Sequence, residues 1–333
     1  MSESIILVEG LTKVFNAKVK AVDDVSFDVK QGEIFGFLGP NGAGKTTTIK
    51  MLTTLLKPTL GKASVCGYDI IKYPTEVRRS IGVVPQEYTA DEDMTGLENL
   101  MLVASLYGIP RSIAKERAEE LLQLVELKDA ATRKVSTYSG GMRRRLELAA
   151  GLINHPRVLF LDEPTLGLDV QTRTAVWQYI RRLKEEYKMT LFMTTHYLEE
   201  ADGLCDRIAI IDHGKIVRIG TPQELKASIG GDVIELGLDN DADDISALIH
   251  QIKLVKEVKR VNSHYRIKSE VGEEAAPQII ELLRSKGYHV TRISLTKPTM
   301  DEVYLEYVGR NFREEEDRTD VMTRRAVLRR ARA

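Results

Sequence analysis

The fold is decided by the stretch Gly39-Pro40-Asn41-Gly42-Ala43-Gly44-Lys45-Thr46-Thr47. An apolar run at residues 33–38 precedes it and predicts a buried strand, while residues 48–52 predict the first turns of a helix. A glycine-rich turn between a strand and a helix is the setting of a phosphate-binding loop. Its glycines let successive N–H groups point inward at an anion, and the helix start adds unpaired N–H groups. The stretch therefore predicts binding of a nucleoside triphosphate.

Two side chains of this loop suit phosphate chemistry. Lys45 supplies a mobile positive charge for the outer phosphates, and the hydroxyl of Thr46 can bind Mg²⁺. A glycine-rich turn with a purely structural role is the alternative. Because every position of the phosphate-loop motif is matched in this setting, we favour nucleotide binding.

Length and composition leave room for two domains and exclude several classes of protein. The chain has 333 residues and a formal net charge of -1, so its overall charge gives no indication of nucleic-acid binding. No apolar stretch approaches the roughly 20 residues that span a bilayer, and residues 1–16 lack the layout of a signal peptide. Cys66 and Cys205 lie far apart and form no metal-type spacing. We therefore expect a cytoplasmic protein with two unpaired thiols.

The segment before the phosphate loop predicts a sheet that ends close to an aromatic residue. Short β-branched or alternating runs at residues 5–8, 11–15 and 22–29 predict antiparallel strands. Phe15 lies ahead of the strand that leads to the phosphate loop, and its ring could stack on a purine. Burial statistics alone favour a core position for such a phenylalanine. The motifs described below favour the purine contact.

The segment after the loop predicts a further strand and then a group of helices. Residues 81–86 predict a buried strand that ends at Gln86. The amide of this glutamine could reach a metal ion or an attacking water, and a solvated loop residue is the alternative. Residues 95–126 predict helices, with a capping box formed by Thr95 and Glu98. We expect a helical insertion at about residues 88–155 in an otherwise α/β chain.

A second glycine turn, Ser139-Gly140-Gly141, opens another predicted helix. Serine is a common N-cap, so a purely structural turn is one interpretation. A helix start that is free to face an anion is the other, and the phosphate loop elsewhere in the chain favours it. The three arginines at residues 143–145 predict a solvated helix face rather than a nucleic-acid contact.

Two neighbouring buried strands are predicted to end in chemically useful side chains. The apolar run at residues 157–164 ends in Asp162 and Glu163, whose side chains diverge because they are successive on a strand. Asp162 can hold Mg²⁺ through water, and Glu163 can act as general base on the attacking water. The run at residues 190–195 ends at His196. The ring of His196 could contact the γ-phosphate or the water, with a structural histidine as the alternative.

Together these residues resemble the ATP-binding cassette (ABC) family of ATPases over about the first two thirds of the chain. The motifs occur in the family's order: residues 39–46 resemble the Walker A loop, Gln86 the Q-loop, Ser139-Gly140-Gly141 the signature, Asp162 and Glu163 Walker B and its catalytic glutamate, Asp169 the D-loop, and His196 the switch histidine. Phe15 would be the adenine-stacking aromatic residue, which is more commonly tyrosine in the family. The resemblance implies ATP and Mg²⁺ as cofactors, with Glu163, His196 and Gln86 as catalytic residues and Thr46, Gln86 and Asp162 near the metal.

The signature departs from the usual sequence of the family at two positions. Tyr138 and Met142 stand where leucine and glutamine are usual. The segment from residue 138 to residue 146 is instead similar to the subfamily that includes daunorubicin/doxorubicin resistance exporters. This departure does not affect the expected ATP contacts, because these come from Ser139 and the glycine backbone.

The resemblance also implies partners. In the family, two cassettes close head to tail over two ATP molecules, so Lys45 and Glu163 of one copy would face Ser139 to Gly141 of the other. The chain holds one motif set, which implies a homodimer or a related partner cassette. Gln86 and the helical insertion would pass the movement to a separate membrane permease that exports a drug, lipid or polysaccharide-like substrate. The protein would then lie on the inner face of the cell membrane.

Two functions other than export would require features of their own in the sequence. Soluble ABC ATPases that act in translation carry two cassettes in one chain, and those that act in DNA repair insert long coiled coils before the signature. The sequence shows neither feature and lacks the basic stripe expected for nucleic acid. A nucleotide-gated scaffold without hydrolysis is disfavoured by the presence of Glu163 and His196.

The resemblance implies a RecA-like core, an antiparallel β subdomain and a helical subdomain in a cassette at residues 1–229. The elements expected in residues 230–310 run βαββαβ, which predicts a small ferredoxin-like α+β domain. Residues 298–305, which include a capping box, are similar to the C-terminal motif of the same exporter subfamily. This domain holds no catalytic group of residues, so regulation or dimer contact is a hypothesis. Residues 311–333 predict a mobile charged tail, solvated or in contact with an anionic membrane.

Overall fold

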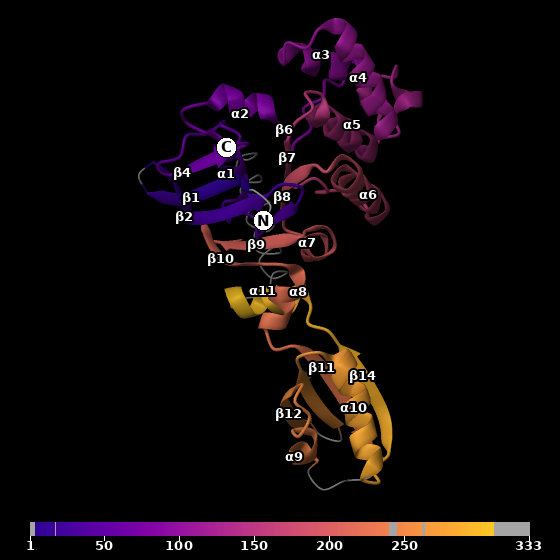
Figure 1. Ribbon diagram of the computed structural model, residues 1–333. Coiled ribbons are helices and arrows are strands. Elements are labelled where there is room, and N and C mark those ends of the chain that lie inside the picture. The colour runs from indigo at the N-terminus through magenta and orange to yellow at the C-terminus, as the bar shows by residue number, and fades with distance from the viewer. Residues whose placement is uncertain (1–3, 17, 240–244, 262–263, 310–333) are drawn as a thin grey trace, which may run out of the picture. The chain divides into compact units, whose positions relative to one another are not determined.

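The chain forms two compact units, shown in the computed structural model of Figure 1. The structure describes residues 4–16, 18–239, 245–261 and 264–309. The first unit holds the chain up to Ile219, and the second unit begins at Gly220. The sequence prediction placed this boundary after residue 229, and the predicted tail at residues 311–333 lies outside the described residues.

The earlier boundary has a physical cause in the contacts of one short helix. Helix α8 (Pro222–Ser228) packs against α11 (Met300–Val308), which also belongs to the second unit. The hydroxyl of Tyr307 donates a hydrogen bond of 2.7 Å to Oγ of Ser228. Helix α8 therefore belongs to the C-terminal unit, whereas the sequence prediction assigned it to the cassette.

The first unit is built around a six-stranded sheet with the order β10-β9-β3-β8-β7-β6. Its strands are β3 (Ile34–Leu38), β6 (Ile81–Val84), β7 (Val158–Asp162), β8 (Thr190–Thr195), β9 (Arg207–Asp212) and β10 (Lys215–Gly220). The pairs β6–β7, β7–β8, β8–β3 and β3–β9 are parallel, and β3, β7 and β8 are buried along their whole length. Because the carboxyl ends of parallel strands meet at one edge, β3, β7 and β8 deliver their following residues to one place.

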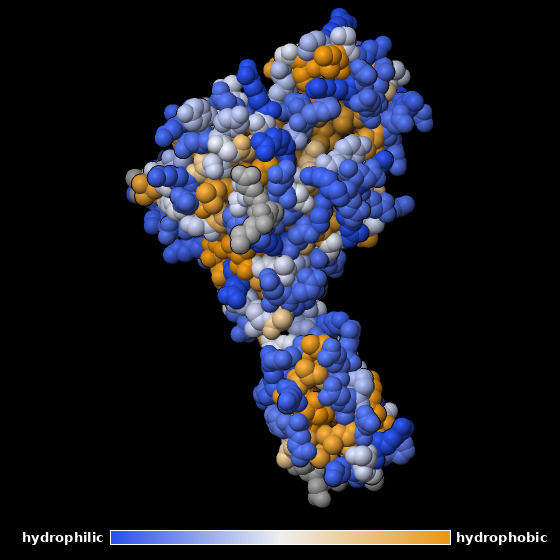
Figure 2. Space-filling model, in the orientation of Figure 1, coloured by the Kyte–Doolittle hydropathy of each residue, from blue (hydrophilic) through white to orange (hydrophobic). Residues whose placement is uncertain are grey.

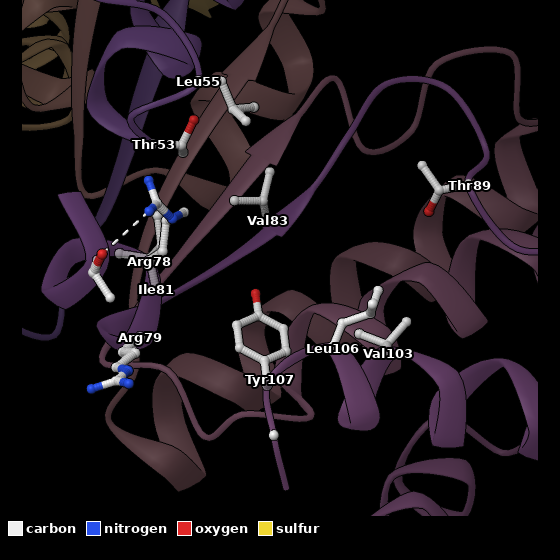
Figure 3. A pocket seen from close by; sticks show the side chains of 12 residues that line it. Thr53, Leu55, Arg78, Arg79, Ile81, Val83, Thr89, Val103, Leu106 and Tyr107 are labelled. Atoms are coloured by element: carbon white, nitrogen blue, oxygen red, sulfur yellow. Dashed lines mark hydrogen bonds between the residues drawn. The ribbon is translucent and has the colours of Figure 1, made fainter.

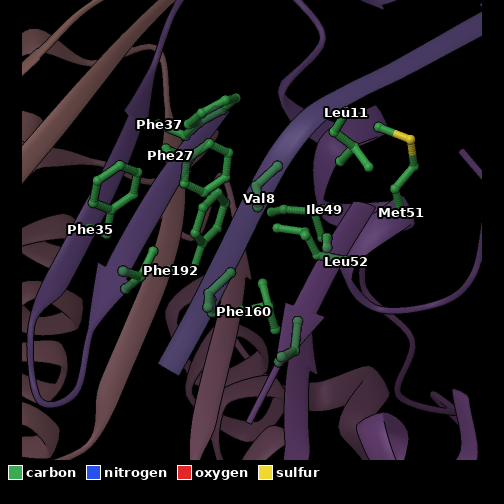
Figure 4. Packing of buried hydrophobic residues seen from close by; sticks show 14 of the residues in the cluster. Val8, Leu11, Phe27, Phe35, Phe37, Ile49, Met51, Leu52, Phe160 and Phe192 are labelled. Carbon is green, nitrogen blue, oxygen red and sulfur yellow. The ribbon is translucent and has the colours of Figure 1, made fainter. Parts of the chain in front are cut away.

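Aromatic packing joins this sheet to its neighbour (Figure 4). Phe192 on β8 lies within 6 Å of the rings of Phe35 and Phe37 on β3, Phe160 on β7 and Phe27, measured between ring centroids. Phe27 comes from strand β2 (Val19–Lys30) of the other sheet. Aromatic pairs of this kind contribute about 0.5–1.5 kcal/mol each beyond their burial. The cluster therefore fixes the strand that carries the phosphate loop.

The second sheet of this unit is antiparallel, as predicted, with the order β2-β1-β4-β5. Strand β1 (Ser4–Phe15) is continuous where the sequence predicted two short runs. Gly10 makes this possible, because its φ of 58° lets the chain pass a register shift between Val8 and Leu11 without breaking the pairing to β2. Strands β4 (Leu60–Val65) and β5 (Tyr68–Asp69) and helix α2 (Pro74–Ser80) follow.

Helices cover the parallel sheet and form a separate cluster of their own (Figure 1). Helix α1 (Lys45–Leu52) follows the phosphate loop, and α6 (Val170–Tyr187) and α7 (Leu198–Leu204) follow β7 and β8. The predicted helical insertion contains α3 (Gly96–Leu106), α4 (Arg111–Leu124) and α5 (Gly140–Leu152), which share one apolar core. The predicted capping box of Thr95 and Glu98 is present at the start of α3. None of the described helices has the length and apolar character needed to cross a membrane.

The second unit has the predicted βαββαβ order and the strand order β12-β13-β11-β14, with every pair antiparallel. Its elements are β11 (Asp232–Leu238), α9 (Ser246–Ile249), β12 (Val255–Val261), β13 (His264–Ser269), α10 (Gly272–Ser285) and β14 (Val290–Thr296). Ile234 and Leu236 of β11 lie in one apolar core with Ile279 and Leu283 of α10. The predicted ferredoxin-like arrangement is confirmed in this unit.

Candidate active site

The phosphate loop follows β3 and folds around the side chain of Lys45. Nζ of Lys45 donates hydrogen bonds to the carbonyl oxygens of Gly39 at 2.6 Å and Pro40 at 3.1 Å. Gly44 has a φ of 107°, and a Cβ there would lie 2.4 Å from the carbonyl oxygen of Ala21, so this position requires glycine. Helix α1 begins at Lys45 with neither a side-chain cap nor an acidic residue in its first turn. The loop therefore presents N–H groups and a positive dipole end to an anion.

Asp162 and Thr46 form an oxygen-rich pair beside this loop. Oδ1 of Asp162 accepts hydrogen bonds from Oγ1 of Thr46 at 3.2 Å and from Oγ1 of Thr194 at 2.6 Å. Burial raises the pKa of Asp162 above its ordinary value, although the two hydroxyl groups act in the opposite direction. Carboxylate and hydroxyl oxygens are the donors that Mg²⁺ prefers. The residues present therefore fit a magnesium ion.

Glu163 lies between two basic groups. Its Oε1 is 3.1 Å from Nζ of Lys45, and its Oε2 is 2.9 Å from Nδ1 of His196. Burial alone would raise the pKa of Glu163, but the hydrogen bond from His196 and the charge of Lys45 lower it to about 2. The carboxylate is therefore ionised in this arrangement, and it balances the charge of the buried Lys45.

The backbone of Glu163 is held in an unusual conformation. Its φ is 48°, in the left-handed region that non-glycine residues rarely adopt. Its N–H lies 3.0 Å from Oγ1 and 3.2 Å from the carbonyl oxygen of Thr194 on the adjacent strand. Conformations of this kind cost on the order of 1 kcal/mol or more and persist where neighbours fix them. Thr194 therefore holds the carboxylate of Asp162 and the backbone of Glu163, a role that the sequence analysis missed.

His196 follows β8 and faces Glu163, as the strand order requires. Its ring centroid lies 4.1 Å from that of Tyr197, and the guanidinium of Arg173 lies 4.1 Å from the centroid of Tyr197. Because an ionised carboxylate can only accept, Nδ1 of His196 carries the proton of this hydrogen bond. The histidine thus orients the carboxylate of Glu163.

Other predicted site residues lie apart from this group. The side chain of Gln86 is exposed, and the backbone carbonyl oxygen of this residue accepts a hydrogen bond from Arg144. Strand β6 ends at Val84, so Gln86 lies in the following loop and not at the end of the strand as predicted. The ring of Phe15 is 39% exposed at the end of β1. Within the described residues, the side chain of Gln86 has no hydrogen bond to the phosphate loop.

The two remaining motifs cap helices at the surface. Oγ of Ser139 accepts a hydrogen bond from the N–H of Met142 at the start of α5. Asp169 caps α6 by accepting from the N–H of Thr172 at 3.0 Å and from its hydroxyl at 2.7 Å, and these bonds lower its pKa. In the described part of the chain, neither side chain is hydrogen-bonded to the phosphate loop. One chain therefore assembles only part of the predicted site.

The unusual Tyr138 of the signature is a core residue. It is buried in the helical cluster, and its hydroxyl donates a hydrogen bond of 2.7 Å to the carbonyl oxygen of Ala130. A Cβ at Gly96 would lie 2.4 Å from this hydroxyl, so the glycine at the start of α3 leaves room for the larger ring. The departure from leucine thus changes the packing beneath the signature and leaves Ser139 and Gly140 exposed.

Comparison with known families finds two matches along the chain. The profile of the family described as "ABC transporter" matches residues 22–166. A second profile, described as "ATP-binding protein DrrA1-3-like, C-terminal domain", matches residues 220–308. The second match begins at the boundary between the two structural units.

Curated relatives match most of the chain. It is 42% identical over 311 residues to a doxorubicin resistance ATP-binding protein of Mycobacterium tuberculosis, covering 90% of this chain and 92% of the relative. It is 36% identical over 309 residues to a linearmycin resistance ATP-binding protein of Bacillus subtilis, covering 92% and 99%. It is 38% identical over 317 residues to a Nod factor export ATP-binding protein of Ralstonia nicotianae, covering 94% and 96%.

Solved structures resemble the first unit. A dimeric ATP-binding cassette in a post-hydrolysis state, bound to ADP and phosphate, has a TM-score of 0.59 at 28% identity and covers 65% of this chain and 98% of that one. A Clostridium perfringens subunit of an ABC transporter complex has a TM-score of 0.62 at 25% identity and covers 67% and 90%.

Proposed function

Because the chain belongs to the ABC family of transporter ATPases, we propose that its buried Lys45, Glu163 and His196 hydrolyse ATP to drive an exporter. The observation that carries this proposal is the meeting of three groups at the carboxyl ends of β3, β7 and β8. The proposed general base, Glu163, lies within hydrogen-bonding distance of both Lys45 of the phosphate loop and His196, which orients it.

Nucleotide binding begins with an exchange of partners by Lys45. In this arrangement its charge is balanced by Glu163 and by two loop carbonyl groups. The phosphates of ATP carry more negative charge than one carboxylate, so Lys45 turns to them while the loop N–H groups bind the same anion. When Lys45 leaves, the pKa of Glu163 rises from about 2. Substrate binding thereby makes Glu163 a better base.

Hydrolysis then uses Glu163 and His196 together. Glu163 takes a proton from the attacking water, and His196 holds the carboxylate in place through Nδ1. Thr46 and Asp162 would hold Mg²⁺, which when bound neutralises charge on the phosphates. Gln86 would reach the metal or the water once its loop moves towards the site.

The exposed motifs imply a second copy. Cassettes of this family act as dimers, and we place Ser139 to Gly141 of one copy against the phosphates bound at Lys45 of the other. Asp169 would lie at the same interface, and Phe15 would stack on the adenine ring. ATP bridges the two copies, and its hydrolysis removes the bridge, so the cycle closes and reopens the dimer.

A cavity of about 890 Å³ between α3 and the parallel sheet is the proposed docking groove for a membrane permease (Figure 3). Leu106 of α3 and Tyr107, which follows the helix, face Ile81 and Val83 of β6 across it. Leu106 is 79% exposed and Leu55 at the rim is 68% exposed, and Figure 2 shows hydrophobic residues gathered over α3. Arg78 and Arg79 of α2 also line the groove and give it positive charge. The groove therefore suits a short amphipathic helix with an acidic residue.

The cargo is proposed from the relatives. Their names refer to resistance to doxorubicin, daunorubicin and linearmycin and to export of Nod factors. We therefore propose a drug, lipid or polysaccharide-like compound as the cargo. A soluble ABC ATPase with a role in translation or on DNA is not favoured. The permease would hold the chain at the inner face of the cell membrane.

Three variants test the assignment of the nucleotide site. Lys45→Ala removes the charge that binds the outer phosphates and is expected to lower ATP turnover at least 100-fold. Glu163→Gln is expected to bind ATP, to hydrolyse it on the order of 100-fold more slowly, and to accumulate a closed dimer. Lys50→Ala is the matched control, because Lys50 is an exposed lysine on the same helix.

The readouts are phosphate release, binding of a fluorescent ATP analogue and size-exclusion chromatography with ATP. Wild-type turnover by Glu163→Gln would show that Glu163 is not the base. Turnover that Lys45→Ala leaves unchanged would remove the phosphate loop from the mechanism.

A further inference from the structure

One face of the signature helix α5 contacts the loop that carries Gln86. Gly140, Arg144 and Glu147 are separated by four and three residues, so they lie on the same face of the helix. We call residues 85–91 the Gln86 loop. The hydroxyl of Tyr88 in this loop donates a hydrogen bond of 3.3 Å to the carbonyl oxygen of Gly140. Contacts of Arg144 and Glu147 with the same loop are closer and more buried.

Arg144 holds the first part of the Gln86 loop. Its two Nη atoms donate hydrogen bonds to the carbonyl oxygens of Pro85 at 2.7 Å and Gln86 at 2.9 Å. The side chain is 1% exposed, and its guanidinium lies 5.3 Å from the ring centroid of Tyr88. A guanidinium that spans two successive carbonyl groups fixes the backbone and leaves the side chain of Gln86 outside. Arg144 therefore sets the position from which Gln86 acts.

Glu147 holds the second part of the Gln86 loop. Its Oε1 accepts from the N–H groups of Thr89 at 2.6 Å and Ala90 at 2.9 Å, and its Oε2 accepts from the hydroxyl of Thr89 at 2.7 Å. The carboxylate is 2% exposed. Charge-assisted hydrogen bonds to buried groups are about twice as strong as neutral ones, and loss of the acceptor leaves two N–H groups without a protein partner. Glu147 thus ties the loop to α5 with three bonds.

The same loop borders the proposed docking groove. A second cavity of about 340 Å³ is lined by Thr89, Ala90 and Glu147 together with Val103 and Leu106 of α3. Thr89, Val103 and Leu106 also line the larger groove. A helix seated in the groove would therefore press on the segment that Glu147 holds. The signature lies at the N-terminal end of α5, the helix that carries Glu147.

We infer that Arg144 and Glu147 are positioning residues that lock the Gln86 loop to the signature helix, so that the loop, the rim of the groove and the signature move as one body. This inference rests on the proposed function, because it assigns the lock to the transfer of movement between the nucleotide and the permease. Neither residue touches the phosphate loop in this structure. Their effect is expected on movement and turnover, not on the first binding of ATP.

Hydrogen–deuterium exchange of the full chain tests the lock. In the wild type, ATP is expected to change the protection of residues 85–91 and 139–148 with one shared concentration midpoint. In Glu147→Ala, residues 85–91 are expected to exchange at least tenfold faster without ATP and to lose the ATP response, while residues 139–148 keep theirs. Glu147→Gln retains an acceptor oxygen and is expected to restore the shared response in part.

The matched control is Arg145→Met on the same helix. Arg145 donates to the carbonyl oxygen of Val125 and contacts Tyr179, and it makes no hydrogen bond to the Gln86 loop in the described structure. The shared response of residues 85–91 and 139–148 is expected to persist in this variant, whereas Arg144→Met is expected to abolish it. Loss of protection in α3 and α4 as well would mean a structural anchor only and would overturn the inference. Unchanged exchange at residues 85–91 in Glu147→Ala would overturn it too.

Kinetics provide a second readout. In Glu147→Ala, the affinity for a fluorescent ATP analogue is expected to stay within twofold of wild type while kcat falls at least tenfold, with Glu147→Gln in between. A weaker affinity with an unchanged kcat would contradict the inference. If the wild type itself does not hydrolyse ATP, the proposed function fails, and the exchange experiment still decides whether the loop and the signature respond together.

Discussion

At the scale of single residues, the pairing of Lys45 with Glu163 explains how a buried lysine and a buried acid share one site. Each charge alone would be expensive to bury, and removal of one partner from such a pair typically costs about 3–5 kcal/mol. In the proposed function the phosphates of ATP offer Lys45 a stronger partner, so nucleotide binding is expected to break this pair. The ion pair thus keeps Glu163 ionised.

The low pKa of Glu163 predicts a pH-dependent contribution to stability. A folded pKa of about 2, below the ordinary value of 4.5, means that ionised Glu163 stabilises the nucleotide-free protein above pH 4.5 and that this stabilisation is lost as the pH falls from 4.5 to about 2. The difference in unfolding free energy between the wild type and Glu163→Gln is therefore expected to shrink in that window. Urea unfolding of both proteins at about pH 7 and about pH 3 measures it. A constant difference would contradict the pairing.

Thr194 is expected to affect turnover through the carboxylate of Asp162 and the backbone of Glu163, both of which it holds. Thr194→Val removes the two bonds of the hydroxyl group, to Asp162 and from the N–H of Glu163, so kcat should fall at least tenfold and the free energy of unfolding by about 1–3 kcal/mol. Thr190→Val is the control, because Thr190 is a buried threonine at the other end of the same strand and accepts from the N–H of Gly32. Equal loss of kcat in both variants would indicate a general effect on the strand. Steady-state hydrolysis and urea unfolding give the two quantities.

At the scale of elements, the sequence could predict what is local along the chain. The phosphate loop, the cap at Ser139 and the acids that end β7 lie within short stretches, and the rule for parallel strands brings β3, β7 and β8 to one edge. The sequence could not predict that Thr194 bonds to the carboxylate of Asp162 and to the N–H of Glu163, or that Glu147 holds residue 89, because these contacts join distant residues and depend on side-chain direction. It also misplaced α8, because a short helix next to a boundary shows no sign of which core it joins.

The groove beside α3 leads to a prediction at the same scale. Leu106→Asp places a charge on the most exposed apolar side chain of the groove and is expected to weaken copurification with the permease at least tenfold, while ATP turnover of the isolated chain stays within twofold of wild type. Leu60→Asp is the control, because Leu60 is 67% exposed on β4 and does not line the groove. Equal copurification of Leu106→Asp and Leu60→Asp would remove the groove as the docking site.

At the scale of the whole molecule, the decisive feature is the separation of the motifs within one chain. Lys45 and Glu163 lie in the buried cluster, whereas Ser139 is exposed at the start of α5. The proposed arrangement therefore takes each complete site from two copies. The C-terminal unit begins at Gly220 and matches its own family profile.

This arrangement predicts that two inactive variants restore each other. Lys45→Ala lacks the phosphate contact and Ser139→Arg blocks the signature, so each alone should be at least 100-fold slower than wild type. In a mixed dimer both lesions fall in one site, and the other site combines an intact Lys45 with an intact Ser139. Equal mixing should thus recover about a quarter of wild-type sites, since half of the dimers are mixed and each has one intact site.

Turnover measured over a range of mixing ratios and total concentrations tests this prediction. Recovery should be largest at equal amounts and should rise with concentration, because it requires association of two chains. The control is a mixture of Lys45→Ala with Glu163→Gln. Both lesions lie in the same half of a site, so every site in that mixture remains defective and no recovery is expected. Full turnover by a strictly monomeric wild-type preparation, without concentration dependence, would contradict the shared site.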